Sequence, residues 1–345
     1  MKVLLLSGYR HLEIVDVPAP QPRPDEVLIR VAACGICGSD VHGYDGSSGR
    51  RIPPLVMGHE AAGVATRVGS AVTGISEGDR VTFDSTIFCG TCRYCLRGKI
   101  NLCEKRRVLG VSCGDYSCGG AFAEYIAVPH RIVHHLPDSL SFPEAAMLEA
   151  VSVALHAAAL SQPAPKQTAL VLGAGMVGLL TVQALQLAGC SPVYVADVDA
   201  SRLELATRLG AHALLATGAQ LVSQTSALTH GEGLDVVVEA VGVDETVRTA
   251  IDCVGKGGTV TLIGNVSPQV TLPLQKVVTR QIRLQGSCAS AGEYPQAMEL
   301  VASGKIQVKQ LISAVVPLEE GPKWFERLYS RELDVMKVIL TPGEV

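Results

Sequence analysis

The sequence is poor in aromatic residues and has no excess of positive charge. Its 345 residues include five Phe and one Trp, and 29 Lys and Arg stand against 33 Asp and Glu, so the formal net charge is −4. A nucleic-acid-binding domain usually combines a basic surface with aromatic side chains on which bases stack. Both features are scarce here, and we therefore expect no nucleic acid as a partner.

The sequence also lacks a secretory leader and long apolar runs. The apolar start at residues 1–6 is ended by residues 7–11, which include Gly8 and Arg10, so we expect a first β-strand there. Gly, Pro or a charge interrupts every longer apolar stretch, and we expect no membrane-spanning helix, no membrane partner and a cytoplasmic location. In that compartment, eleven cysteines indicate metal or thiol chemistry rather than disulfides.

The length and two different sequence patterns predict two domains, at roughly 100 to 200 residues each. Up to about Glu149, Gly- and Pro-rich turns separate short β-rich runs such as residues 26–31 and 61–68, which predicts an irregular β domain. Beyond it, apolar strands alternate with helical stretches, which predicts a parallel sheet with helices on both faces. These strands are expected at residues 168–172, 193–198, 234–238 and 260–263. Periodicity does not decide whether residues 288–345 finish this sheet or return to the first domain.

A glycine-rich turn, Gly173-Ala174-Gly175-Met176-Val177-Gly178, lies between an expected strand and an apolar helix. In a dinucleotide-binding turn, the first glycine permits the tight turn, the second lets the pyrophosphate approach the backbone, and the third lets the helix pack against the strand. The helix start offers backbone N–H groups and a positive end to the phosphates. We therefore predict that this turn binds a dinucleotide.

Asp197 ends the next strand, about 20 residues further on, where a carboxylate can accept hydrogen bonds from the adenosine ribose. Since it would also repel a 2′-phosphate, it predicts NAD, although the nearby Arg202 leaves limited room for NADP. Asp199 is a competing acid, to which we assign an ordinary solvated role because Asp197 directly follows the apolar strand. Further cofactor contacts are expected at strand ends facing the cofactor crevice: Val241-Gly242 and Ile263-Gly264-Asn265.

A compact group of cysteines follows the spacing C-x2-C-x2-C-x7-C; its members are Cys89, Cys92, Cys95 and Cys103. Four thiolates can close a tetrahedral zinc shell and order a lobe that has little core of its own. No ligand position stays open, which predicts a structural zinc. An iron–sulfur cluster is the weaker alternative, because it needs an electron-transfer context that the sequence does not show.

A second, more dispersed group offers ligands of mixed type. Cys37 and His59 are a soft and a borderline zinc ligand, and Glu60 or Glu149 can add an oxygen while water or substrate takes the remaining position. Such an open shell is typical of a catalytic zinc. The pair Arg50-Arg51 precedes His59, and we expect one of the two to face the cleft and meet a phosphate or carboxylate of the substrate. An ordinary pair of surface-loop arginines is the alternative.

Several of these segments together resemble the zinc-dependent medium-chain alcohol dehydrogenases, over nearly the whole chain. The resemblance rests on Gly58-His59-Glu60, Gly63, Val68-Gly69, the four-cysteine lobe and the glycine turn at residues 173–178. Within that superfamily, residues 37–42 and 148–156 look like the polyol dehydrogenase branch, which includes sorbitol, galactitol-phosphate and threonine dehydrogenases.

The resemblance implies an α/β chain of two domains. Residues 1–152 would form a GroES-like β-barrel catalytic domain, completed by residues 289–345 and carrying the structural zinc lobe at residues 85–112. Residues 153–288 would form a Rossmann domain with a doubly wound parallel sheet that binds the cofactor. The active site would lie in the cleft between the two domains.

The resemblance also implies a ligand set for the catalytic zinc. Cys37, His59 and Glu60 would hold the ion, and Glu149 would bind it directly or through the zinc-bound water. Glu149 stands where the alcohol dehydrogenases have a second cysteine, a departure that polyol dehydrogenases share. Which glutamate belongs to the inner shell is left open.

Three further residues receive roles from the resemblance. Asp40 would orient His59, fixing its tautomer and raising its basicity. Ser39 would receive the proton of the alcohol, and His42 would pass it to solvent. Zinc would polarise the alcohol oxygen while the carbinol hydrogen leaves as hydride to the nicotinamide.

We therefore expect an NAD-dependent zinc dehydrogenase that interconverts a secondary alcohol and a ketone, with two zinc ions per chain. Its substrate would be a polyol, a sugar alcohol or a sugar-alcohol phosphate, and the resemblance implies a homodimer or homotetramer. One alternative is an amino-alcohol dehydrogenase of the threonine type. The other is a non-enzymatic zinc-ribbon or redox-sensing protein, against which the open group of Cys37, His59 and Glu60 argues.

Overall fold

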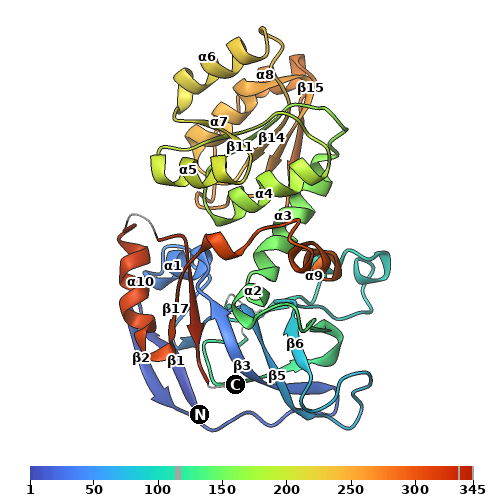
Figure 1. Ribbon diagram of the computed structural model, residues 1–345, viewed down its shortest axis with the longest axis vertical. Helices are drawn as coiled ribbons and strands as arrows, with labels where there is room; N and C mark the ends of the chain where they lie inside the picture. The colour runs from blue at the N-terminus through green and yellow to red at the C-terminus, as the bar shows by residue number, and fades with distance from the viewer. Residues whose placement is uncertain (113–117, 333–334, 344–345) are drawn as a thin grey trace. The chain divides into compact units, whose positions relative to one another are not determined.

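The computed structural model describes residues 1–112, 118–332 and 335–343, and the chain forms two compact units. Unit 1 consists of Met1–Glu149 together with Tyr294–Val345, and unit 2 consists of Ala150–Glu293. The C-terminal segment therefore returns to the unit of the N-terminal half, as the blue and red parts of the ribbon show (Figure 1). The domain boundaries expected at 152/153 and 288/289 stay predictions.

Unit 1 is built around a seven-stranded sheet, the GroES-like barrel, in the order β10-β6-β5-β3-β18-β17, with β9 also pairing with β3. All neighbours are antiparallel except the parallel pair β17 and β18. The strands are β3 (Glu26–Gly35), β5 (Glu60–Val68), β6 (Arg80–Phe83), β9 (Tyr125–Pro129), β10 (Val133–His135), β17 (Ile312–Pro317) and β18 (Lys337–Thr341). The last strand lies against the end of β3, with Ile339 opposite Gly35.

Short strands and helices complete unit 1. A three-stranded sheet contains β2 (His11–Asp16), β1 (Lys2–Gly8) and β4 (Leu55–Val56), and a hairpin pairs β7 (Thr86–Ile87) with β8 (Arg107–Val108). The helices are α1 (Gly38–Tyr44), α2 (Phe142–Ala145), α9 (Tyr294–Ala302) and α10 (Gly321–Tyr329), with 3₁₀ turns η1 (Cys95–Arg97), η2 (Ile100–Leu102), η4 (His130–Ile132), η5 (Lys309–Leu311) and η6 (Leu318–Glu320). These elements have two to nine residues each, which fits the frequent turn signals of this half.

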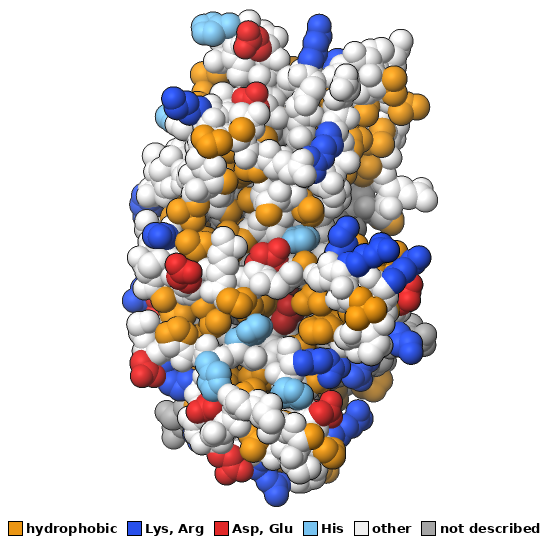
Figure 2. Space-filling view, turned by 90° about the vertical axis from the view of Figure 1, so that its right-hand side faces the viewer, with side chains coloured by type: hydrophobic (Ala, Val, Ile, Leu, Met, Phe, Trp, Pro, Cys, Tyr) orange, Lys and Arg blue, Asp and Glu red, His pale blue; other side chains and the backbone are white. Residues whose placement is uncertain are grey.

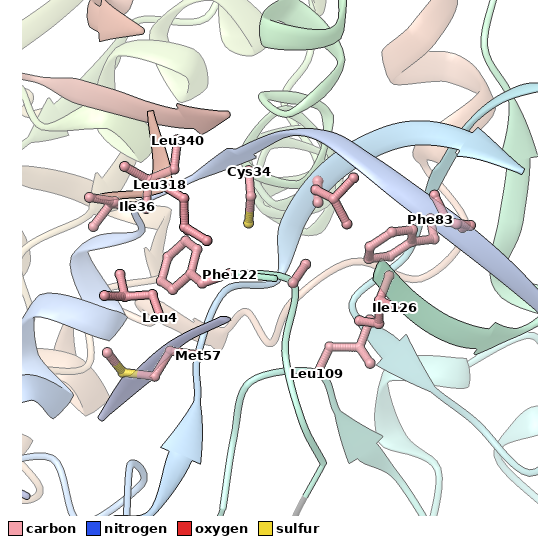
Figure 3. Close-up of a cluster of buried hydrophobic side chains, with 14 of the residues drawn as sticks. Leu4, Cys34, Ile36, Met57, Phe83, Leu109, Phe122, Ile126, Leu318 and Leu340 are labelled. Atoms are coloured by element: carbon pink, nitrogen blue, oxygen red, sulfur yellow. The ribbon is translucent and has the colours of Figure 1, made fainter. Parts of the chain in front are cut away.

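The core of unit 1 joins residues from both ends of the chain. Figure 3 shows Leu4 and Phe122 together with Leu318 and Leu340 from the C-terminal segment, all of them buried. The ring of Phe122 meets that of Phe325 edge to face, with centroids 5.8 Å apart. Burying each such side chain contributes about 1.5–3 kcal/mol, so the returning segment is an integral part of this core.

Unit 2 contains six parallel strands in the order β13-β12-β11-β14-β15-β16. Counted along the chain, this is the order 3-2-1-4-5-6 of the doubly wound dinucleotide-binding fold. The strands are β11 (Ala169–Leu172), β12 (Val193–Ala196), β13 (His212–Leu214), β14 (Leu234–Glu239), β15 (Val254–Leu262) and β16 (Arg283–Gly286). The strand order reverses between β11 and β14, and ligands of such sheets bind at the carboxyl ends of the strands there.

Helices flank this sheet, as Figure 1 shows. They are α3 (Leu148–Ser161), α4 (Met176–Leu187), α5 (Ala200–Arg208), α6 (Gly218–Leu228), α7 (Asp244–Cys253) and α8 (Leu274–Thr279). The four residues of β11 are all buried, because helices cover the sheet. The predicted fold class, a GroES-like domain plus a Rossmann domain, is confirmed.

Within the described residues, one helical stretch is long and apolar enough to cross a membrane by length and composition alone. This stretch is Phe142–Ser161, with 20 residues, and 72% of its most apolar window is buried inside the protein. Pro143, Glu144 and Glu149 interrupt this stretch, as expected, but they do not lower its mean hydropathy below that of a candidate span. Its burial is that of a core helix. On the face shown in Figure 2, basic and acidic side chains are interspersed with apolar ones.

Candidate metal and cofactor sites

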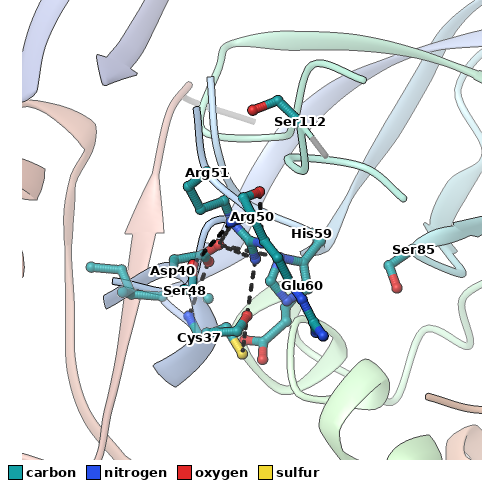
Figure 4. Close-up of polar contacts among 12 residues, drawn as sticks. Cys37, Asp40, Ser48, Arg50, Arg51, His59, Glu60, Ser85 and Ser112 are labelled. Atoms are coloured by element: carbon teal, nitrogen blue, oxygen red, sulfur yellow. Dashed lines mark hydrogen bonds and ion pairs between the residues drawn. The ribbon is translucent and has the colours of Figure 1, made fainter. Parts of the chain in front are cut away.

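The start of α1 places Cys37 and Asp40 together. Cys37 precedes the helix with an extended backbone, and its N–H donates to Asp40 Oδ2 over 3.3 Å. Asp40 is fully buried, and its Oδ1 accepts from Arg51 Nε at 3.1 Å and Nη2 at 2.9 Å. Burial opposes ionisation of Asp40, but His59 and Arg51 outweigh it and lower the pKa to about 2. Asp40 is therefore a fixed negative charge below the site (Figure 4).

His59 faces this charge from the turn before β5. Its Nδ1 lies 3.5 Å from Asp40 Oδ1, longer than a formed hydrogen bond, and this buried nitrogen has no hydrogen-bond partner among the described residues. Burial disfavours the charged imidazole, yet Asp40 and Cys37 raise the pKa of His59 well above its usual range. A carboxylate beside one ring nitrogen is the usual arrangement for a histidine whose other nitrogen binds a metal.

Glu60 begins β5 opposite Gly35 of β3, and it is 1% exposed. Its Oε2 accepts from Lys337 Nζ at 2.5 Å, and the same ammonium donates to the carbonyl of Ile36 at 3.1 Å. A Cβ at position 35 would lie 2.4 Å from Glu60 Oε2, so glycine leaves the space for this carboxylate. Lys337, also buried, was not found by sequence reasoning, because it lies 277 residues away in the sequence.

The predicted ligands Cys37, His59 and Glu60 come together, with one ligand atom of each within 4.8 Å of the others. A thiolate, an imidazole and a carboxylate at this spacing fit a zinc ion and leave a fourth position open. Figure 4 shows the three side chains converging. Glu149 is not part of this group, so its place in the inner shell stays a prediction.

Glu149 lies in the first turn of α3, where its Oε1 accepts from Ser85 Oγ at 3.4 Å. Burial raises the pKa of Glu149 to about 7, with His59 opposing the shift and Glu60 adding to it. The carboxyl group is thus within electrostatic range of the ligand group without belonging to it.

The remaining side chains with predicted roles lie along α1 and in the following loop. Ser39 is exposed, and its hydroxyl donates to Cys37 Sγ over 3.3 Å while accepting from Arg51 Nη2 over 3.0 Å. His42, three residues further along α1, is exposed on the same helix. Arg51 is 4% exposed and bound to Asp40, so Arg50, which is exposed, is the member of the pair for which the expected substrate contact stays a prediction.

The four predicted cysteines of the lobe also come together. Their Sγ atoms all lie within 4.8 Å of one another, with Cys92 and Cys95 3.5 Å apart and Cys89 and Cys95 4.0 Å apart. A tetrahedron with zinc–sulfur distances of about 2.3 Å has sulfur–sulfur edges of about 3.8 Å, so the donors fit a zinc ion. Backbone N–H groups of Cys92 and Lys105 donate to Cys89 Sγ and Cys103 Sγ, at 3.4 and 3.3 Å.

In unit 2 the glycine turn joins β11 to α4 as predicted from the sequence. Gly173 has φ +99°, which favours glycine, and a Cβ on Gly178 would lie 1.9 Å from the carbonyl oxygen of Gly173. A Cβ on Gly175, which caps α4, would meet no atom within 4 Å. The open space at this helix start fits a pyrophosphate approaching the N–H groups of Met176 and Val177.

Asp197 follows β12 and lies next to this turn. Its Oδ2 accepts from Ala174 N at 2.6 Å, and its Oδ1 accepts from Asp199 N at 2.9 Å. Asp199 does not have the ordinary solvated role expected for it: its carboxylate caps α5 by accepting from Ser201 N, and it pairs with Arg202 Nε at 3.4 Å. Arg202 is thus already held by a carboxylate.

The loops after β14 and β15 meet backbone to backbone. Gly242 has φ +86°, and a Cβ there would lie 2.2 Å from Asn265 N, while one on Gly264 would lie 2.1 Å from Gly242 N. The N–H groups of Ile263 and Gly264 donate to the carbonyl oxygen of Glu239. The predicted cofactor segments 241–242 and 263–265 are therefore one structural feature at the carboxyl edge of the sheet.

Glu239 anchors this feature and was missed by sequence reasoning. It is 0% exposed, and its Oε1 accepts from Val241 N at 2.9 Å, Gly242 N at 2.7 Å and Thr246 Oγ1 at 2.7 Å. Its Oε2 is buried and has no hydrogen-bond partner within the described parts of the chain. The sequence did contain a signal for Glu239, because it is an acidic residue directly after the apolar run 236–238.

A GroES-like unit that gathers metal ligands, joined in one chain to a Rossmann unit, defines a metal- and dinucleotide-dependent oxidoreductase. Comparison with known proteins agrees: residues 23–138 match the alcohol dehydrogenase GroES-like domain family, and residues 176–303 match the zinc-binding dehydrogenase family. The chain belongs to the zinc-binding alcohol dehydrogenase family. It is therefore an alcohol dehydrogenase that uses a nicotinamide cofactor, and the expectation of a non-enzymatic zinc protein is set aside.

Similar proteins match over almost their full length. Sorbitol dehydrogenase of Bacillus subtilis is 34% identical over 348 residues, covering 99% of this chain and 98% of that protein. The crystal structure of galactitol-1-phosphate dehydrogenase from Escherichia coli has a TM-score of 0.91 and 26% identity, covering 99% of this chain and 100% of that one. A zinc-binding dehydrogenase from Sinorhizobium meliloti, bound to NADP, has a TM-score of 0.89 and 33% identity, with 99% of each chain covered.

Proposed function

We propose that this protein oxidises a secondary alcohol of a polyol, sugar alcohol or sugar-alcohol phosphate with NAD, and reduces the ketone in the reverse direction. The observation that carries the proposal is the group of Cys37, His59 and Glu60, whose ligand atoms lie within 4.8 Å and leave one position open. The names of the sorbitol and galactitol-1-phosphate relatives support a polyol substrate.

In this proposal, zinc bound by Cys37, His59 and Glu60 supplies Lewis-acid polarisation of the alcohol oxygen. Asp40 holds the imidazole of His59 and keeps its own charge, since its pKa is about 2. Ser39, which already lies 3.3 Å from Cys37 Sγ, takes the proton of the alcohol. His42, on the same helix, passes that proton to solvent.

The two glutamates have different parts in the proposal. Glu60 forms an ion pair with Lys337, and this positive charge lowers the net negative charge of the ligand group. Glu149, with a pKa of about 7, can hold a proton near neutral pH and is within electrostatic range of His59 and Glu60. Cys89, Cys92, Cys95 and Cys103 hold a second, structural zinc.

The choice of NAD rests on Asp197. Its carboxylate is fixed beside the glycine turn by Ala174 N, where it would repel a 2′-phosphate. Arg202, the one nearby cation considered for NADP, is paired with Asp199. Because a related structure from Sinorhizobium meliloti holds NADP, both cofactors belong in the test.

The first experiment is NADH and NADPH formation across polyols, polyol phosphates and threonine, with the zinc content measured before and after mild chelation. Turnover on one polyol class with NAD, lost together with one zinc per chain, supports the proposal. Turnover on threonine alone contradicts the substrate class and favours the amino-alcohol alternative. No turnover on any alcohol, despite two zincs and NAD binding, contradicts the proposed function.

Two variants sharpen this experiment. Cys37→Ser should lose one zinc and the turnover, whereas Cys190→Ala, a buried cysteine of unit 2 outside both ligand groups, should keep both. Arg50→Ala tests whether the substrate carries an anion: its KM should rise for polyol phosphates only. Arg51 is unsuitable for that test, because it binds Asp40.

The expected cellular and oligomeric setting is part of the same proposal. We place the protein in the cytoplasm on its sequence pattern, and its resemblance to polyol dehydrogenases implies a homodimer or homotetramer. Light scattering after size exclusion would contradict this part if the chain were a monomer at micromolar concentration.

A further inference from the structure

Arg51 is a buried cation in the middle of the proposed catalytic group. It lies in the loop between α1 and β4 and is 4% exposed. Its Nε and Nη2 donate to Asp40 Oδ1 at 3.1 and 2.9 Å, and Nη2 also donates to Ser39 Oγ at 3.0 Å (Figure 4). One guanidinium thus joins a carboxylate and a hydroxyl.

The two side chains that Arg51 joins, Asp40 and Ser39, have different roles in the proposed reaction. Asp40 faces His59 Nδ1 at 3.5 Å and orients it. Ser39 lies 3.3 Å from Cys37 Sγ and takes the proton. Since Arg51 donates to both, the placement of the imidazole and the placement of the proton acceptor depend on the same side chain.

The fold makes room for this arginine at one glycine. A Cβ at Gly43, in the last turn of α1, would lie 2.0 Å from Arg51 Cγ and 2.7 Å from its Cβ. Gly43 does not have a positive φ, so its backbone would accept alanine. Glycine lowers helix stability relative to alanine, and here its absent side chain is what lets the arginine shaft pass.

We propose that Arg51 is a positioning residue for the dehydrogenase reaction, which fixes Asp40 and Ser39 relative to each other from behind the ligand group. The inference rests on the proposed function, because the roles of Asp40 and Ser39 belong to it. A lysine would carry the same charge, but a single ammonium lacks the planar fork that donates from two nitrogens to two acceptors.

The test compares Arg51→Lys and Arg51→Ala with the wild type by steady-state kinetics and by the rate at which a chelator withdraws zinc. Loss of a partner behind a metal ligand typically costs 10–100-fold in metal affinity or activity. We expect kcat to fall 10- to 100-fold in both variants with the KM for NAD unchanged. In both variants, the chelator should withdraw the more labile of the two zinc ions at least 10-fold faster than it does from the wild type.

A double-mutant cycle with Gly43→Ala makes the test specific. Gly43→Ala alone displaces the arginine and should lower kcat by a similar factor. In an Arg51→Gly background neither the Cβ nor the Cγ is left to displace, so Gly43→Ala should change kcat less than twofold. Independent, multiplying effects of the two substitutions would overturn the inference.

Arg80→Ala is the matched control. Arg80 is another arginine of unit 1 that binds main-chain carbonyls, those of Pro137 and Leu140, and it touches none of the ligand group. It should lower the melting temperature without changing kcat or zinc loss. If the Arg51 variants behave like Arg80→Ala, the positioning role is wrong. If the wild type turns over no alcohol, the proposed function fails, while the zinc-loss rates still decide whether Arg51 supports the ligand group.

Discussion

The ion pair of Glu60 and Lys337 is the residue-scale feature with the largest energetic consequence. Both side chains are buried, with Lys337 2% exposed, and each satisfies the charge of the other. Burial opposes the charged form of Lys337, but Glu60 and Cys37 raise its pKa. Removing one partner of such a pair leaves an uncompensated charge in the interior, which is far more costly than replacing both.

We therefore expect Lys337→Met to lower the free energy of unfolding of the metal-free protein by about 3–5 kcal/mol. The double variant with Glu60→Gln should recover most of that loss, because no charge is then left alone. Urea unfolding of the chelated wild type, both single variants and the double variant gives the coupling. Single losses that simply add in the double variant would show that the two side chains act independently.

Asp197 and Asp199 make a second residue-scale prediction, since they lie two residues apart and carry the same charge. Asp197→Asn keeps one acceptor oxygen for either Ala174 N or Asp199 N, and it removes the charge that opposes a 2′-phosphate. The ratio of kcat/KM for NADP to that for NAD should rise at least 10-fold. Asp199→Asn, the control at the cap of α5, should leave the ratio within twofold. An equal rise of this ratio in both variants would mean that the overall negative charge of the region, and not Asp197 in particular, selects against NADP.

The metal ligands could be predicted from the sequence, whereas the side chains that pair with them or with their neighbours could not. Cys37, His59 and the four lobe cysteines have the donor chemistry and spacing of metal ligands, which the sequence shows directly. Lys337 approaches Glu60 across 277 residues, and Arg51 meets Asp40 through a loop, so no local pattern reports either contact. Of the pair Arg50-Arg51, Arg51 is paired with Asp40 inside the protein, so the expected substrate contact stays a prediction for Arg50.

At the scale of elements, the loop after β14 depends on one carboxylate. Glu239 Oε1 accepts from two backbone N–H groups and from Thr246 Oγ1, all within 2.9 Å. Hydrogen bonds to a charged group are worth about 1.5–3 kcal/mol each, so this side chain fixes the loop against α7. The second oxygen, Oε2, is buried and has no hydrogen-bond partner in the part of the chain that the structure describes, and Glu239→Gln would place an NH₂ group there.

Glu239→Ala should therefore loosen the predicted cofactor contacts and raise the KM for NAD at least 10-fold, with a smaller effect on the KM for the alcohol. Glu239→Gln, which keeps one acceptor oxygen, should lie between the wild type and the alanine variant. Isothermal titration of NAD into the three proteins checks the same order without turnover. An unchanged affinity in Glu239→Ala would mean that backbone contacts alone hold the loop.

Helices and strands could be predicted from the sequence where their burial requires a simple pattern of apolar residues. The strand β11 is a continuous apolar run covered on both faces, and the glycine turn after it needs residues without side chains. By contrast, β13 has three residues, two of them exposed, and α6 begins with glycine and carries Thr, Ser and Gln along much of its length. Neither has a pattern that separates it from a loop, and both owe their structure to packing against neighbours in unit 2.

At the scale of the whole molecule, the chain has two units with separate cores and different reasons for stability. Unit 2 has a sheet of six parallel strands covered by helices. Unit 1 includes a lobe whose 3₁₀ turns, η1 and η2, contain few buried residues: none in η1 and Asn101 in η2. Such a lobe has little core of its own, so its order depends on the four thiolates and the metal they bind.

Removal of the structural zinc should therefore act on one part of the molecule. Hydrogen exchange followed by mass spectrometry, on protein with and without chelator, should show faster exchange in peptides covering residues 89–108. Peptides covering β11 and β14 should exchange as before, because their amides are protected by the sheet of unit 2. Cys92→Ser should reproduce the chelated pattern without chelator, whereas Cys190→Ala should not. Faster exchange in both units would mean that the metal stabilises the chain as one cooperative structure, and the lobe would then be part of the common core.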